Sequence, residues 1–240
     1  MAEGTSRFGR HRPAGRPKTR RTLVGASPDA YTSRMPASEP EIPLPEEGAP
    51  RWNLGNFVGS GYDRGRGPLW QVAWMLVSGI VVVRWWCPVR LRIAILRWFG
   101  ATIGDNVVLR HRVRIHWPWK LSVGDRSWIG EDVWVLNLEP VTIGSDVCVS
   151  QSVLLCTGSH DRHSPTFEFD NGPIVIDDGA WIAARATILR GTRIGKNSVI
   201  GATSLVTSDV PDGSFVRAPR SDVRAPRAER LSGSHDRDPV

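Results

Sequence analysis

The chain of 240 residues has few cysteines and no pair of them in a C-x-x-C motif. Its three cysteines are Cys87, Cys148 and Cys156, an odd number at irregular spacing. This pattern argues against a disulfide framework and against a thiolate metal site, and it suits a reducing cytosol. The N-terminal segment also lacks the apolar stretch of a secretory signal, so we expect a cytoplasmic protein.

Acidic residues are missing between Arg7 and Arg21, where seven basic residues occur. This stretch is rich in Gly and Pro and offers no apolar core. We therefore expect a disordered, basic and Pro-rich tail over residues 1–50 and a flexible C-terminal tail over residues 220–240. The net charge of +7 is unevenly spread, and a solvated tail is favoured over nucleic-acid binding. Contact of the tail with phosphates or with an anionic membrane surface stays open.

No charged residue occurs between Arg66 and Arg84, yet this stretch is shorter than the ~20 residues of a membrane-spanning helix. It is rich in Trp and leads into four arginines: Arg84, Arg90, Arg92 and Arg97. A helix packed on the protein and a helix in a membrane interface are both favoured over a spanning one. Residues 51–100 are thus predicted to be a hydrophobic helical segment, in which Pro88 separates two helices. We expect these helices to cover the open edge of the domain that follows.

An aliphatic residue returns at every sixth position from residue 103 onward, in several runs. These residues are Ile103, Leu109, Ile115, Val123, Ile129, Val135, Ile143, Val149, Leu155, Ile176, Ile182, Ile188, Ile194, Ile200 and Val206. A second column of small or β-branched residues lies four positions after each of them, except the three that precede a longer step: Val107, Val113, Ser127, Val133, Val147, Val153, Ala180, Ala186, Thr192, Ser198, Ser204 and Val210. Residues two apart in a strand share a face, so each unit is predicted to send one bulky and one small side chain inward.

The step of six is broken three times, and each break follows a third unit. The longer steps are eight, eight and twenty-one residues: Ile115 to Val123, Val135 to Ile143, and Leu155 to Ile176. Three units therefore form one coil, which predicts a three-sided solenoid of parallel strands. Gly often follows the aliphatic residue, as at Gly104 and Gly124, and is predicted to turn the corner without steric cost. Insertions on one edge of a repeat protein usually build the binding site.

The stretch from Trp134 to Trp181, with "PIVIDDGAWIAARATILRGTRIG" after the long insertion, resembles the hexapeptide-repeat acyltransferases. It is most similar to acetyltransferases of exopolysaccharide and colanic acid biosynthesis, in the branch of maltose, galactoside and nodulation-factor acetyltransferases. The resemblance covers about residues 68–219 and implies a mainly β fold, a left-handed parallel β-helix over residues 101–219. It implies transfer of an acetyl group from acetyl-CoA to a hydroxyl of a sugar or polysaccharide precursor. It further implies a homotrimer without metal or nucleic acid, and peripheral contact with the inner face of the membrane stays open.

The resemblance also assigns roles to single residues. His160 in "TGSHD" matches the family's general base, which takes a proton from the attacking hydroxyl. Asn137, at the same corner one coil earlier, is expected to bind a substrate hydroxyl, although a corner Asn bonded to its own backbone is nearly as good an explanation. The acetyl-CoA contacts are expected on later coils: Trp181, Ala184, Ala202, Thr207 and Arg220. The family usually carries Lys after the Thr, where this chain has Ser208, and either Arg217 or Arg220 remains for the 3′-phosphate.

Two other functions compete with this one. A zinc carbonic anhydrase of the same β-helix class would need three converging histidines, and His111 and His116 have a suggestive spacing beside His160. In that class, however, the paired histidines come after the single one, and here they come before it. A non-catalytic β-helix scaffold is the second alternative, favoured by the altered C-terminal end and disfavoured by the presence of His160.

Overall fold

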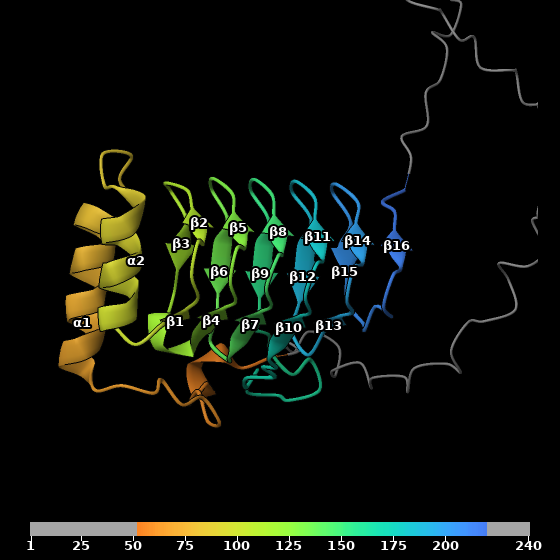
Figure 1. The fold of residues 1–240 in the computed structure, drawn as a ribbon. Coiled ribbons are helices and arrows are strands. Elements are labelled where there is room, and N and C mark those ends of the chain that lie inside the picture. Colours follow the sequence, from red (N-terminus) through yellow and green to blue (C-terminus); the bar gives the residue numbers. More distant parts are fainter. Residues whose placement is uncertain (1–51, 220–240) are drawn as a thin grey trace, which may run out of the picture. The chain divides into compact units, whose positions relative to one another are not determined.

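The computed structural model describes residues 52–219, which form a short helical segment followed by a parallel β-helix (Figure 1). The tails predicted over residues 1–50 and 220–240 lie outside the described residues. The helical elements are the 3-10 turn η2 (Leu54–Asn56), helix α1 (Pro68–Val77), its π-helical continuation η3 (Ser78–Val82), helix α2 (Val89–Trp98) and the 3-10 turn η4 (Pro118–Lys120). Pro88 is the N-cap residue of α2, as predicted. Among the described residues, no helix has the length and apolar character needed to cross a bilayer.

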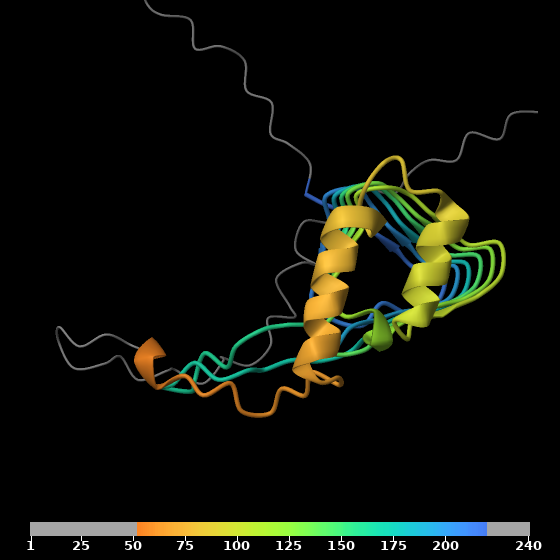
Figure 2. The same ribbon diagram turned by 90° about the vertical axis from the view of Figure 1, so that its left-hand side faces the viewer.

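The β-helix has three parallel sheets, one for each side of the coil. The first sheet contains β1 (Thr102–Ile103), β4 (Leu121–Val123), β7 (Val141–Ile143), β10 (Ile174–Ile176) and β13 (Arg193–Ile194). The second contains β2 (Val108–Leu109), β5 (Trp128–Ile129), β8 (Cys148–Val149), β11 (Trp181–Ile182), β14 (Val199–Ile200) and β16 (Phe215–Val216). The third contains β3 (Arg114–Ile115), β6 (Trp134–Leu136), β9 (Leu154–Cys156), β12 (Thr187–Leu189) and β15 (Leu205–Val206). Figure 2 looks along the stack and shows its three-sided outline.

The hydrophobic core of the solenoid consists of the two predicted columns. Every residue of both columns is buried, with at most 7% of its surface exposed. The register pairs the aliphatic column with itself, so that Ile129 lies opposite Val149 and Val149 opposite Ile182. Each coil therefore buries apolar surface only against the coils above and below it, as in other solenoids.

The corners differ from the prediction in one respect. The residue with positive φ is the third after the aliphatic, for example Asn106 (φ 56°) and Arg126 (φ 57°), and not the Gly directly after it. That Gly is needed for close packing between coils. A Cβ on Gly124 would lie 2.6 Å from both the carbonyl carbon of Gly144 and the backbone nitrogen of Ser145. Glycine here allows backbone to approach backbone rather than a left-handed turn.

The first coil exposes one carbonyl on each side that has no earlier coil to bind. In later coils, the carbonyl of the aliphatic residue accepts a hydrogen bond from the previous coil, as Val123 O does from Gly104 N–H (2.8 Å). Three side chains from the helices take over this role in the first coil. Arg97 donates to Ile103 O, Arg92 to Leu109 O and Trp74 to Ile115 O, at 2.7, 2.7 and 3.2 Å. The helices thus end the stack chemically as well as sterically, as expected for the open edge of a sheet.

Arg92 is the centre of this arrangement, which we call the helical cap (residues 68–99). Only 2% of its surface is exposed. Its guanidinium also donates to the carbonyls of Val82 (2.7 Å), Arg84 (2.9 Å) and Cys87 (2.9 Å). Burial lowers the pKa of this guanidinium from its usual value. No carboxylate is needed, because four carbonyl dipoles satisfy the buried cation.

Candidate active site

The long insertion leaves the stack after β9 and forms a protruding hairpin, the histidine loop (residues 157–173). His160 and Phe169 pair as an antiparallel bridge across this loop. The backbone bonds from Asp161 N to Glu168 O (2.8 Å) and from Asp170 N to Ser159 O (2.9 Å) extend the pairing. Figures 1 and 2 both show the loop projecting from one corner of the β-helix. His160 therefore stands on a regular hairpin rather than on an irregular loop.

The imidazole of His160 is fixed by one hydrogen bond and by aromatic rings. Its Nδ1 lies 2.7 Å from the carbonyl oxygen of Phe167. Its ring stacks on that of Phe167 at 4.3 Å and 10°, and on that of Phe169 at 5.2 Å and 23°. A carbonyl oxygen can only accept, so Nδ1 carries the proton in the neutral ring and Nε2 keeps a free lone pair. This is the tautomer that a general base requires.

A second segment, residues 52–67, lies along the histidine loop, and we call it the strap. Its contact is held by Glu168, whose carboxylate accepts the backbone N–H groups of Val58 (3.0 Å) and Ser60 (2.9 Å). These hydrogen bonds hold the pKa of Glu168 below its ordinary value, and the bond from Val58 has the largest effect. Phe57 of the strap meets the ring of His160 edge-on at 5.7 Å. Within the segment 51–100, the two main helices, α1 and α2, lie in residues 68–98, and the part before them serves the loop.

Loss of the Glu168 carboxylate should loosen the strap and misplace His160. We expect Glu168→Ala to lower turnover about tenfold, since small displacements of a catalytic group are costly. The measurement is steady-state kinetics with saturating acetyl donor. Asp146→Ala is the matched control, because its carboxylate also accepts two hydrogen bonds, both from Arg126, on a remote part of the surface. Equal activity of the two variants would show that the strap does not position the loop.

Asn137 does not lie where a substrate would reach it, and its assignment to substrate binding is corrected here. The residue is 0% exposed. Its side-chain oxygen accepts the backbone N–H of Trp117 (2.9 Å), and its NH₂ group donates to the carbonyl of the same residue. Asn137 thus replaces a strand partner for Trp117 and joins two coils at this corner. It follows Val135 by two positions, so its inward direction was readable from the repeat.

The predicted cofactor residues occupy several outer positions on the later coils. Trp181 on β11 is 49% exposed, and its indole N–H donates to Ser150 Oγ (3.0 Å). Ala184 and Ala202 hold equivalent places at the corner between the second and third sheets. In the described part of the chain, neither backbone N–H has a hydrogen-bond partner. Thr207 is exposed after β15, and Arg220 lies outside the described residues.

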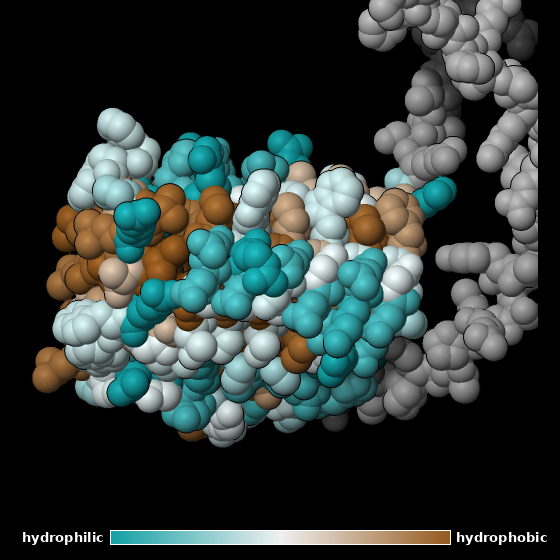
Figure 3. Space-filling view, viewed as in Figure 1, coloured by the Kyte–Doolittle hydropathy of each residue, from teal (hydrophilic) through white to brown (hydrophobic). Residues whose placement is uncertain are grey.

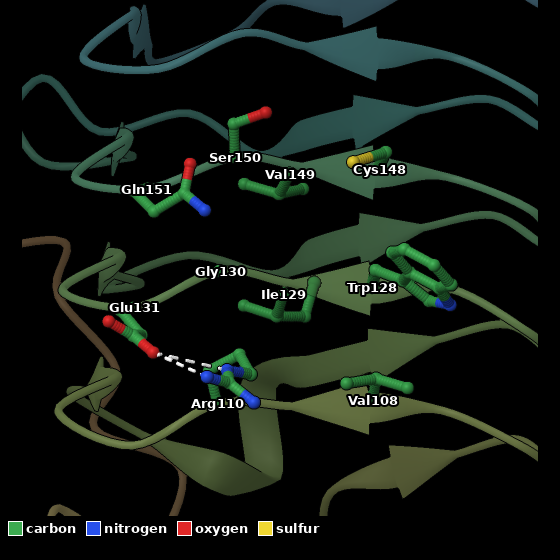
Figure 4. Close-up of a pocket in the computed structure, with 10 residues that line it drawn as sticks. All are labelled: Val108, Arg110, Trp128, Ile129, Gly130, Glu131, Cys148, Val149, Ser150 and Gln151. Carbon is green, nitrogen blue, oxygen red and sulfur yellow. Dashed lines mark hydrogen bonds and ion pairs between the residues drawn. The ribbon is translucent and has the colours of Figure 1, made fainter.

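One chain does not bring all these residues together. His160 projects from the corner between the third and first sheets, whereas Ala184 lies at the corner between the second and third. The width of the third sheet separates them. Beside the second of these corners is a groove of about 400 Å³ on the outer face of the second sheet, drawn in Figure 4. Trp128 and Cys148 lie on neighbouring strands there, and Arg110 forms an ion pair with Glu131 (2.7 Å) at the rim.

Comparison with known proteins identifies the family. A model of the family described as "Bacterial transferase hexapeptide (six repeats)" matches residues 173–208. The chain is 40% identical over 160 residues to the putative colanic acid biosynthesis acetyltransferase WcaF of Escherichia coli K12, covering 65% of this chain and 86% of that protein. The chain belongs to the hexapeptide-repeat acetyltransferases.

Two solved hexapeptide-repeat acetyltransferases share the fold. One, from Vibrio cholerae O1 biovar eltor, is complexed with acetyl coenzyme A and superimposes with a TM-score of 0.59 at 25% identity, over 66% of this chain and 88% of that one. The other is a galactoside acetyltransferase in complex with coenzyme A, with a TM-score of 0.57 at 26% identity, over 62% of this chain and 76% of that one. The predicted fold and family are thereby confirmed, and the alternative of a non-catalytic scaffold loses its support.

The three histidines considered for a zinc site lie on separate elements of this hexapeptide-repeat acetyltransferase. His111 follows β2, His116 follows β3, and His160 lies on the histidine loop. Burial, followed by the nearby charges of Arg64 and Lys120, lowers the pKa of His116. Across residues 52–219, no three His, Cys, Asp or Glu side chains gather where they would hold a metal.

The sequence analysis missed the residues that surround His160 in this acetyltransferase. Phe57, Phe167, Glu168 and Phe169 all contact the base or hold the strap against it. The alternation in "TFEF" (Thr166 to Phe169) was the available signal, since period two indicates a strand. Nothing in the local sequence of the strap indicated that it would reach a loop about 110 residues later.

Proposed function

We propose that the protein transfers an acetyl group from acetyl-CoA to a hydroxyl of a sugar or polysaccharide precursor, with His160 as general base. The observation that carries this proposal is the hydrogen bond from His160 Nδ1 to Phe167 O, which leaves Nε2 free to accept a proton. The printed names of the relatives, a colanic acid and a galactoside acetyltransferase, support a sugar acceptor. We place this activity in the cytoplasm.

In the proposed reaction, His160 both takes the proton from the attacking hydroxyl and later returns it to the departing CoA sulfur. Nε2 of His160 takes the hydroxyl proton while the oxygen attacks the thioester carbonyl carbon. The negative charge that develops on the carbonyl oxygen needs a preorganised donor, and the unpaired N–H of Ala184 is our candidate. The C–S bond then breaks, and the departing CoA sulfur receives the proton from the imidazolium. The ester product and free CoA leave a neutral His160.

We propose that acetyl-CoA binds along the later coils. The solved relatives complexed with acetyl-CoA and with CoA support this choice of donor. Small side chains at Ala184 and Ala202 let a ligand approach the backbone, and the exposed ring of Trp181 offers an apolar wall. Arg217, whose guanidinium lies 5.2 Å from the ring centre of Phe215, is the described candidate for the 3′-phosphate beside Arg220. Thr207 is a hydroxyl contact in the same scheme.

We propose that the complete site forms between subunits of a homotrimer, because His160 and Ala184 lie at different corners of one chain. This predicts complementation between two inactive variants, His160→Ala and Ala184→Trp. A random 1:1 mixture of the two variants should regain about a quarter of wild-type activity, since each site needs one intact residue from each of two neighbours. The measurement is turnover after co-refolding or co-expression, with size-exclusion light scattering to verify trimers.

The control for this experiment is the His160→Ala variant refolded or expressed alone, which should stay inactive. A mixture that stays as inactive as this control would show that each chain contains its own full site. Activity of a monomer would contradict the homotrimer itself.

The direct test of the proposed function is acetyl-CoA turnover, followed by release of the CoA thiol, against free sugars, nucleotide sugars and polyprenyl-linked glycans. We expect turnover with at least one hydroxyl acceptor and an alkali-labile ester product. Turnover only with amine acceptors would contradict O-acetylation, and failure to bind acetyl-CoA in calorimetry would contradict the choice of donor.

A further inference from the structure

Helix α1 and its continuation η3 are apolar on two opposite faces. The inner face buries Trp74 and Val82 in the hydrophobic core, two helical turns apart. The outer face carries four exposed aliphatic side chains: Leu69 (87%), Val72 (54%), Leu76 (58%) and Ile80 (61%). A helix on the surface of a water-exposed protein normally carries polar residues on this side. The outer face is therefore unusual and points to a function.

The apolar surface continues beyond this one helix. Trp85 (80%) and Trp86 (52%) are exposed in the connection after η3, and Leu91 (46%) and Trp98 (67%) are exposed on α2. Figure 3 shows a brown region over part of the helical end of the molecule, with hydrophilic residues beside it. Trp is the residue that favours the boundary between lipid and water, because it joins a large apolar ring to a polar N–H. The position of these rings at the edge of the face fits such a boundary.

The charged residues of the segment that carries this face all have one sign. From Arg64 to Gly104 the chain contains six arginines and no acidic residue. Arg92 is buried in the helical cap, while Arg84 and Arg90 are exposed beside the apolar residues. A surface that is apolar in the middle and basic at the rim complements an anionic bilayer. A second copy of the same face would instead bring arginine against arginine.

A basic groove of about 720 Å³ opens beside Trp85, between the helical cap and the first two coils. It is lined by Arg84, Arg112 and Arg114 among other residues. Asp132 also lines it, and its carboxylate pairs with Arg112 at 2.7 Å. Within residues 52–219, Arg84 and Arg114 have no carboxylate partner, so their guanidinium groups are available to a phosphate. The groove thus offers phosphate contacts next to the apolar face.

We infer that the helical cap is a docking surface for an anionic phospholipid bilayer. The outer face of α1 and η3 enters the interface between headgroups and acyl chains, and the basic groove receives a lipid phosphate. The helices lie flat, since neither is long enough to cross a bilayer. This inference does not depend on the proposed acetyl transfer, because it uses none of the residues assigned to that reaction.

The test is flotation of the full chain with vesicles, either of phosphatidylcholine alone or with 30 mol% phosphatidylglycerol (roughly the anionic content of a cytoplasmic leaflet). We expect binding to the anionic vesicles, at least tenfold weaker binding to the neutral ones, and partial loss of binding in 0.5 M NaCl (about a 4 Å screening length). The double variant Leu76→Glu/Ile80→Glu should bind at least tenfold more weakly. Both side chains are exposed, so the variant should fold, as an unchanged thermal melting curve would confirm.

A second pair of variants distinguishes binding by the arginines of the groove from attraction by the overall positive charge. Arg84→Gln/Arg114→Gln should weaken binding to anionic vesicles by more than the control Arg126→Gln/Lys196→Gln, which removes two exposed cations elsewhere. Binding that survives Leu76→Glu/Ile80→Glu unchanged would overturn the inference, since the basic residues before residue 22 would then suffice. Absence of flotation with anionic vesicles would also overturn it. So would end-to-end association of the protein in solution that the same variant abolishes without any vesicle binding.

Discussion

Replacement of His160 by alanine is expected to lower kcat by about 10²- to 10⁴-fold, the range for loss of a positioned general base. The KM for acetyl-CoA should change little, because the proposed cofactor contacts lie on other coils. His163→Ala and His116→Ala are the matched controls. His163 is exposed on the same loop, and His116 follows β3 beside Trp117, and neither shares the bond to Phe167 O. The comparison uses a competent acceptor and equal amounts of each folded variant.

A second substitution makes this test sharper. Gln in place of His160 keeps a polar side chain of similar size but cannot take up a proton near neutral pH. It should therefore be as inactive as the Ala variant. Wild-type turnover by His160→Ala would show that the acyl transfer proposed here uses another base. Equal losses in all three single His variants would indicate a shared structural or metal role instead.

Replacement of Arg92 by methionine is expected to give the largest loss of stability. The variant keeps the volume of the side chain but leaves the carbonyls of Val82, Arg84, Cys87 and Leu109 without their donor. Each unsatisfied buried polar group costs about 1–3 kcal/mol, part of which water can restore. We expect the free energy of unfolding to fall by at least about 3 kcal/mol, measured by chemical denaturation and circular dichroism.

The matched control is Arg90→Met, two residues earlier on the exposed side of α2. Its effect should stay within about 0.5 kcal/mol, as for most surface substitutions. If both variants unfold at the same denaturant concentration, the carbonyls of the first coil do not need the helical cap. An insoluble Arg92→Met chain beside a soluble Arg90→Met chain would agree with the expected loss.

The β-helix could be predicted from the sequence because its information is local and repeated. Each coil places Ile, Val or Leu at the same step, and a single miscount would be corrected by the next unit, as at Ile182, Ile188 and Ile194. The insertion containing His160 was equally visible as a gap in the count. For Asn137 the corner position allowed either substrate binding or a bond to backbone, and only its burial, in line with its place two residues after Val135, favours the bond to backbone.

The contacts around the ends of the stack could not be predicted in the same way. The bond from Arg92 to Leu109 O joins a helix to a strand, and nothing in the period of either element specifies it. The strap is a stronger case, since Glu168 meets Val58 across 110 positions of chain. Such contacts depend on where two separately folded elements meet in space. A repeat count gives the elements but not their meeting points.

The coil from which the histidine loop leaves sets the distance of the loop from the helical cap along the stack. The loop leaves the third coil, two steps from the coil that the helices cover. At about 4.8 Å between neighbouring strands, those steps add roughly 10 Å to the roughly 10 Å thickness of a helix. On a bilayer, the imidazole of His160, our proposed base, would lie about 20 Å above the helix face that enters the interface, a height suited to a glycan that extends from its lipid anchor rather than to the anchor itself.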